Sequence, residues 1–65
     1  MRENLRNARK AANMTQGQVA EKLGISERYY RFIEAGTRGG DFEIWDALED
    51  LFNIHQKLLR EISSD

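Results

Sequence analysis

The sequence lacks cysteine and proline entirely and contains one histidine among its 65 residues. Without cysteine it can form neither a disulfide framework nor a thiolate metal site. It also has no signal peptide and no apolar run of membrane-spanning length, so we expect a soluble, cytoplasmic protein. A chain this short accommodates one small core, which predicts a single domain over residues 1–62 and a frayed tail over residues 63–65.

The only histidine, His55, gives no support for catalysis. It lies at the start of a predicted helix, with no paired nucleophile and no metal-ligand spacing around it. Asp46, Glu49 and Asp50 lie on a helix flank, where they are better interpreted as solvated charges than as a catalytic pair. We therefore expect no enzyme activity, no metal and no cofactor, and no small-molecule site is evident.

Helix-forming residues dominate the chain, and this composition predicts an all-α fold. Most of the expected helices have a Ser, Thr or Asp cap at their start, or a Gly or Asn at their end. The segment TQGQ at residues 15–18 also has the pattern of a capping box. The expected helices cover about residues 3–12, 15–24, 27–35, 41–53 and 55–62.

The charges are distributed unevenly, although the net charge is only -1. Residues 1–38 contain eight Lys or Arg and four Asp or Glu, whereas residues 39–65 contain two and seven. Such asymmetry indicates one surface that meets an anion and another that does not. Ordinary solvated helix faces would explain the same composition equally well.

Residues 16–35 have the pattern of two helices joined by a very short turn. Such a joint needs a small residue where the helices cross, a glycine in the turn and an apolar residue at the corner. Ala20, Gly24 and Ile25 occupy those positions. Inward apolar positions then follow at helical spacing, namely Val19, Leu23, Tyr30 and Ile33.

The segment TQGQVAEKLGISERYYRFIEAGTR resembles the phage-repressor-like (XRE-type, lambda-repressor-like) helix-turn-helix family. LRNARKAANMT upstream looks like the first helix of that family, and DFEIWDALEDLFNI downstream looks like the fourth helix and the entry to the fifth. The resemblance implies a compact five-helix domain of bacterial or phage origin, with its second and third helices forming the helix-turn-helix. It also implies that the protein binds double-stranded operator DNA at the nucleoid, as a two-fold dimer that controls transcription.

The third helix should have two different faces. Tyr30 lies three residues before Ile33 and faces the core, whereas Arg28, Tyr29 and Phe32 share another side. The resemblance places that side in the major groove of DNA. Arg28 can bind guanine, Phe32 can meet a thymine methyl, and Glu27 can accept from cytosine or point away from the phosphates. A partly covered apolar cap on the core is the alternative for Tyr29 and Phe32.

Phosphate contacts are expected around the third helix, because such contacts supply much of the affinity for DNA. The resemblance implies a backbone contact at Gln16, where the free amides at the start of the second helix also favour an anion, and at the basic loop that holds Thr37 and Arg38. Each of these side chains, taken alone, could equally be a solvated group. The candidates are Gln16, Tyr29, Arg31, Thr37 and Arg38.

The resemblance also implies a partly buried ion pair between Arg9 and Glu34, which would tie the first helix to the third. Two departures from the family pattern stand out. Glu49 replaces a small apolar residue of the fourth helix, so we expect either looser packing there or a slightly rotated helix. Gly39 and Gly40 replace an Asn-Pro-like turn, so we expect a looser loop.

Self-association is expected from surplus apolar residues on the last two helices. Phe42, Trp45, Leu48 and Phe52 suffice for the core, which leaves Ile44, Leu51 and Leu59 for an isologous dimer contact. In such a dimer, two recognition helices about 34 Å apart would read a palindrome. Ordinary exposed aliphatic residues are the alternative.

Two functions are consistent with these patterns. The charge asymmetry and Arg28 favour a sequence-specific DNA-binding regulator, specifically a repressor. The low isoelectric point of 5.8 and the aromatic surface favour a protein-interaction module with the same fold, such as an antitoxin or an assembly factor.

Overall fold

The computed structural model describes residues 1–63 of the chain. This part of the chain forms five helices and no strand, which confirms the all-α fold. None of these helices is long and apolar enough to cross a membrane. The helices are α1 (Glu3–Ala11), α2 (Gln16–Leu23), α3 (Glu27–Ala35), α4 (Phe42–Phe52) and α5 (Gln56–Arg60).

The predicted helix ends are confirmed where local signals set them. Thr15 and Gln18 form the capping box of α2: the Gln18 amide donates to Thr15 Oγ1 over 3.1 Å, and the Thr15 amide donates to Gln18 Oε1 over 2.8 Å. Ser26 caps α3 and Asp41 caps α4 by accepting one hydrogen bond each, from the Tyr29 amide and the Ile44 amide. Gly24 ends α2 with φ +72°, a left-handed conformation that costs glycine little.

The end of the chain differs from the prediction. Helix α5 ends at Arg60 instead of continuing to residue 62. The Ser63 amide, in the first residue of the predicted frayed tail, donates to the Met1 carbonyl over 2.9 Å. The reason is a contact with the other end of the chain, which local sequence does not reveal. The other two residues of that tail, 64 and 65, lie outside the described residues.

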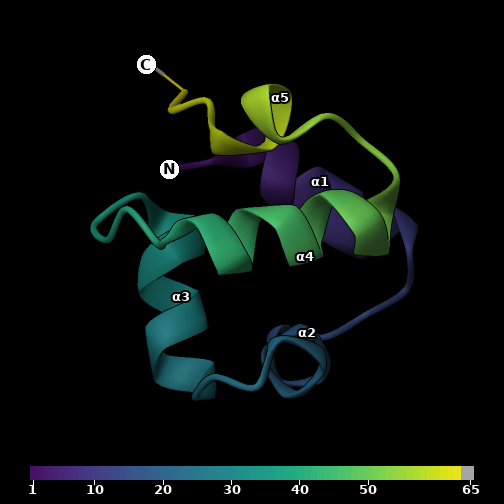
Figure 1. Cartoon of the computed structure of the whole chain (residues 1–65), viewed down its shortest axis with the longest axis vertical. Coiled ribbons are helices and arrows are strands. Elements are labelled where there is room, and N and C mark those ends of the chain that lie inside the picture. Colours follow the sequence, from purple (N-terminus) through teal and green to yellow (C-terminus); the bar gives the residue numbers. More distant parts are fainter. Residues whose placement is uncertain (64–65) are drawn as a thin grey trace.

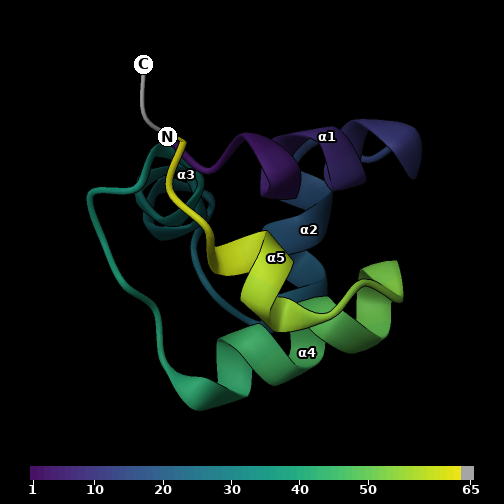
Figure 2. The same ribbon diagram turned by 90° about the horizontal axis from the view of Figure 1, so that it is seen from above.

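The helices surround one core. In Figure 1, α2 is seen end-on while α3 runs in the plane of the view, so their axes cross as a helix-turn-helix requires. Helix α4 packs on α2 and α5, and α1 packs on α3 and α5. Figure 2 shows α5 lying between α1 and α4, with α3 seen end-on beside the N-terminus. This arrangement leaves one side of α3 uncovered.

The core corrects three assignments made from sequence. Ile44 and Leu59, expected at a dimer contact, are 6% and 0% exposed and belong to the core. Phe42, expected in the core, is instead 79% exposed. The inward stripe of α4 is centred on Ile44, Trp45 and Leu48, and this orientation places Phe42 on the solvent flank.

Two other positions on the last helices have clear roles. Leu51 is half-buried against the core, so it too is not a fully free surface residue. Glu49 is accommodated without entering the core, because its Oε1 accepts a 2.9 Å hydrogen bond from Gln56 Nε2. His55 caps α5: its Nδ1 accepts from the Lys57 amide over 3.0 Å.

Candidate nucleic-acid interface

Helix α3 has the two faces that its sequence predicts. Tyr30 and Ile33 are fully buried against the core, whereas Arg28, Arg31 and Phe32 are exposed. The helical period separates the two sets, and the Ser26 cap and Gly36 end fix how far the helix extends. Phe32, which is 36% exposed, is therefore available to a ligand.

Two guanidinium groups lie close to the Phe32 ring. The Arg28 guanidinium, from the first turn of α3, and the Arg38 guanidinium, from the following loop, each lie 5.7 Å from the ring centroid. Both contacts are within cation–π range. A hollow of about 330 Å³ opens beside the ring, lined by Phe32, Ala35, Thr37 and Arg38. This arrangement combines an apolar surface with a cationic rim.

The loop after α3 is wrapped around one carbonyl. The Phe32 carbonyl accepts hydrogen bonds from the amides of Gly36, Thr37 and Arg38, at 3.1, 3.0 and 3.3 Å. The Thr37 hydroxyl donates to the same oxygen over 3.2 Å. These bonds bring Thr37 and Arg38 next to the exposed side of α3. The predicted phosphate-contacting loop and the predicted base-contacting helix therefore form one surface.

The same loop is fastened from the inside, so the expectation of a loose Gly39-Gly40 turn is wrong. Trp45 Nε1 donates to the Gly39 carbonyl over 2.7 Å, and Arg2 Nη1 donates to the Arg38 carbonyl over 2.9 Å. Sequence reasoning did not identify Arg2. Arg2 binds main-chain carbonyls, and residue spacing in the sequence does not reveal which carbonyls a side chain will bind.

Glu27 and Arg31 neutralise one another on the surface. Glu27 Oε2 accepts from Arg31 Nη2 over 2.6 Å, one helical turn apart. A Cβ atom added to Gly17 would lie 3.0 Å from Glu27 Oε1. The carboxylate therefore leans over the first turn of α2, which explains why a residue without a side chain suits that position.

The Arg9–Glu34 ion pair is confirmed. Arg9 Nε lies 2.9 Å from Glu34 Oε2 and Arg9 Nη2 lies 3.1 Å from Oε1, so the contact is bidentate. Gln16 Nε2 donates to Glu34 Oε1 over 3.3 Å. The Gln16 side chain is thus turned toward the ion pair.

Two pKa shifts follow from this buried network. The hydrogen bond to Glu34 raises the pKa of Arg9 above its usual value. Burial, together with the nearby Glu34 carboxylate, raises the pKa of the Tyr30 hydroxyl well above its usual value. Among the described residues the buried Tyr30 hydroxyl has no hydrogen-bond partner. Both groups keep their ordinary charge state near neutral pH.

Tyr29 is the least exposed of the predicted DNA-contacting residues on α3. It is half-buried and packs on the core. It also lines a hollow that reaches the α2–α3 turn and Asp41 and Glu43 of the α4 start. Within residues 1–63, no group of three or more His, Cys, Asp or Glu is arranged to hold a metal ion.

Comparisons with known proteins agree with this geometry. A family described as Helix-turn-helix matches residues 5–55. The chain is also similar to the cryptic phage CTXphi transcriptional repressor RstR of Vibrio cholerae, with 43% identity over 53 residues. The aligned region covers 75% of this chain and 47% of that repressor, so the chain spans about half the length of its relative. No solved structure gives a significant match.

Proposed function

The chain belongs to the helix-turn-helix family, and from that premise we propose that it is a DNA-binding transcriptional regulator that acts as a repressor. In this proposal α3 enters the major groove of double-stranded operator DNA at the nucleoid of a bacterial cell. The observation that carries it is the uncovered side of α3, where Arg28, Phe32 and Arg38 are exposed together.

Base reading is assigned to the first turns of α3. Arg28 can donate two hydrogen bonds to guanine, and each good contact of this kind is worth about 1–3 kcal/mol of discrimination. Phe32 and the hollow beside it suit a thymine methyl group. Glu27 would reach a cytosine amino group only after its ion pair with Arg31 opens.

Phosphate binding is assigned to the surroundings of α3. The exposed Arg38 and Thr37 follow the helix, and Arg31 would become available when Glu27 moves. Gln16 would contribute its main-chain amide, since its side chain is bonded to Glu34. Tyr29 would donate its hydroxyl from the edge of the surface.

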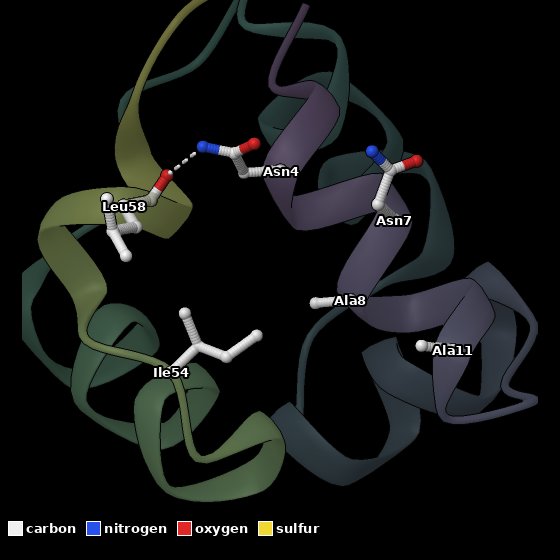
Figure 3. Close-up of a pocket in the computed structure, with 6 residues that line it drawn as sticks. All are labelled: Asn4, Asn7, Ala8, Ala11, Ile54 and Leu58. Atoms are coloured by element: carbon white, nitrogen blue, oxygen red, sulfur yellow. Dashed lines mark hydrogen bonds between the residues drawn. The ribbon is translucent and has the colours of Figure 1, made fainter.

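A homodimer that reads a palindromic operator completes the proposal. Because Ile44 and Leu59 are buried in the core, the contact surface of this dimer is assigned instead to the exposed side of α5. Leu58 is 51% exposed there. Ala8, Ala11, Ile54 and Leu58 line an adjoining hollow of about 390 Å³ between α1 and α5, shown in Figure 3.

The test is a selection of bound sequences from random DNA, followed by titration of the selected duplex and a shuffled duplex. We expect tight binding of the selected duplex only, with an affinity that falls steeply between about 50 and 200 mM salt. Arg38→Ala should lower the slope of log affinity against log salt by about one. Lys57→Ala on α5 removes the same charge and should leave that slope unchanged. Equal, negligible affinity for every duplex would contradict the proposal.

The acidic α4 supports a second candidate, a protein-interaction module. None of the carboxylates on α4 forms a salt bridge within residues 1–63. Such a surface suits a cationic protein partner and opposes DNA. The same titration separates the two candidates, because a module of this kind would show no duplex preference at any salt concentration.

A further inference from the structure

We infer that Arg2 is a positioning residue for DNA binding, because it clamps the main chain of the loop that presents Arg38. The inference rests on the proposed function, in which Arg38 binds a phosphate. Arg2 itself is only 7% exposed, so it cannot reach DNA as a contact. Any effect it has on binding must pass through the residues that it holds.

The Arg2 guanidinium joins three segments of the chain through their carbonyls. Its Nε donates to the Arg60 carbonyl at the end of α5 over 3.0 Å. Its Nη1 donates to the Ile33 carbonyl near the end of α3 over 2.6 Å and to the Arg38 carbonyl in the loop over 2.9 Å. One side chain therefore fixes the loop relative to α3 and to α5.

The electrostatics show that Arg2 is not held by an ion pair. No carboxylate within residues 1–63 forms a salt bridge with Arg2. Burial, with a smaller contribution from the nearby Arg60 charge, lowers the pKa of Arg2. The carbonyl at the C-terminal end of α3 carries a partial negative charge that favours a cation there. The planar fork of arginine suits these separated acceptors, whereas the single ammonium of lysine does not.

Trp45 completes the clamp from the same side. Its ring lies under the Arg2 guanidinium, 5.0 Å from ring centroid to Cζ, and its Nε1 donates to the Gly39 carbonyl. Two successive carbonyls, of Arg38 and Gly39, are thus held by two side chains that stack on each other. On the outer side, the Arg38 guanidinium lies over Phe32. Releasing the inner clamp would let the Arg38 side chain leave that position.

Arg2→Lys tests the inference because it keeps the net charge and removes the fork. We expect the salt slope on the selected duplex to fall by about one, as in Arg38→Ala. Adding Arg38→Ala to Arg2→Lys should cost less than about twofold further affinity, because the two changes remove one contact. Arg60→Lys is the matched control. The Arg60 guanidinium is the other cation over the Trp45 ring, but the Arg60 side chain donates no hydrogen bond to the loop. The inference would be overturned if Arg2→Lys kept the wild-type slope of log affinity against log salt. It would also be overturned if the affinity losses of Arg2→Lys and Arg38→Ala added in full in the double variant.

Two further measurements separate this inference from folding and from the proposed function. Circular dichroism tests whether each variant is folded at the assay temperature. If Arg2→Lys unfolds, Arg2→Met takes its place and Arg60→Met becomes the control. Without DNA, Arg2→Lys should shift the emission of Trp45, the only tryptophan, and speed amide exchange at Thr37 and Arg38. Unchanged emission and exchange would refute the clamp whether or not the protein binds DNA.

Discussion

Glu34 links α3 to α1 through its side chain. It is 2% exposed and accepts hydrogen bonds from both Arg9 and Gln16. Glu34→Ala leaves the partly buried Arg9 charge without its carboxylate partner, and we expect a loss of about 1–3 kcal/mol in the free energy of unfolding. Urea denaturation measures this change.

The exposed pair on α3 provides a matched control for that measurement. Glu27→Ala removes a carboxylate from a pair one helical turn apart, where the expected loss is about 0.3–0.5 kcal/mol. Equal shifts of the urea midpoint for Glu34→Ala and Glu27→Ala would show that burial of the Arg9–Glu34 pair contributes nothing.

The Tyr30 hydroxyl makes stability depend on alkaline pH. Its pKa is raised by burial in the folded state, so the unfolded chain loses this proton first, near pH 10. Below that pH, the protonated Tyr30 hydroxyl makes its full contribution to the free energy of unfolding. Above it, the free energy of unfolding should fall by about 1.4 kcal/mol per pH unit.

Comparing wild type with Tyr30→Phe isolates this effect from the other groups that titrate at alkaline pH. The difference between their urea midpoints should change steadily above pH 10. A difference that stays constant from pH 8 to pH 11 would mean that the hydroxyl reaches water in the folded protein.

Residue environments were predictable from sequence where spacing or a motif specifies the partner. The spacing of Tyr30 and Ile33 predicted that Tyr30 is buried, and the motif positions of Arg9 and Glu34 predicted their ion pair. The structure confirms both predictions. Ile44 and Leu59 were assigned wrongly because a surplus of apolar residues does not reveal how α4 and α5 rotate. Arg2 was missed because it binds carbonyls that the fold brings together.

At the scale of elements, the end of α2 rests on the conformation of Gly24. Its φ of +72° strains any L side chain, although no atom lies within 4 Å of an added Cβ. Gly24→Ala should therefore cost about 1 kcal/mol through backbone strain alone. For a domain of this size that loss lowers the melting temperature by roughly 4–8 °C.

Gly24→Asn distinguishes backbone strain from any effect of added bulk. Asparagine tolerates the left-handed conformation better than alanine does, so its melting temperature should lie between those of wild type and Gly24→Ala. A lower melting temperature for Gly24→Asn than for Gly24→Ala would contradict this explanation.

Helix ends were predictable to the extent that they are local. Thr15, Ser26 and Asp41 each cap a helix with an oxygen three residues from its donor, so the pattern is visible in the sequence. Helix α5 ends early because its last turn is met by other segments, including the Arg2 side chain at the Arg60 carbonyl. That partner is 58 residues away, beyond the reach of local patterns.

At the scale of the whole molecule, two adjacent leucines on α5 face different environments. Leu59 is fully buried, whereas Leu58 is 51% exposed beside the hollow shown in Figure 3. Leu59→Glu should unfold the domain because it buries an unpaired charge. Leu58→Glu should leave the fold intact and convert the proposed dimer into a monomer.

Circular dichroism and sedimentation equilibrium on both variants check this pair of predictions. A folded Leu59→Glu would contradict its place in the core. A folded Leu58→Glu with the same mass in solution as wild type would remove this side of α5 from the dimer contact.

The hydrogen bond between Ser63 and Met1 has a practical consequence for anyone assaying the protein. Main-chain atoms of Met1 lie 3.6 Å from where a Cβ on Gly36 would be, next to Thr37 and Arg38. A purification tag or fluorophore fused ahead of Met1 would therefore lie close to the loop that carries Thr37 and Arg38. A dye attached through a cysteine introduced at Lys22, on the outside of α2, avoids the termini altogether.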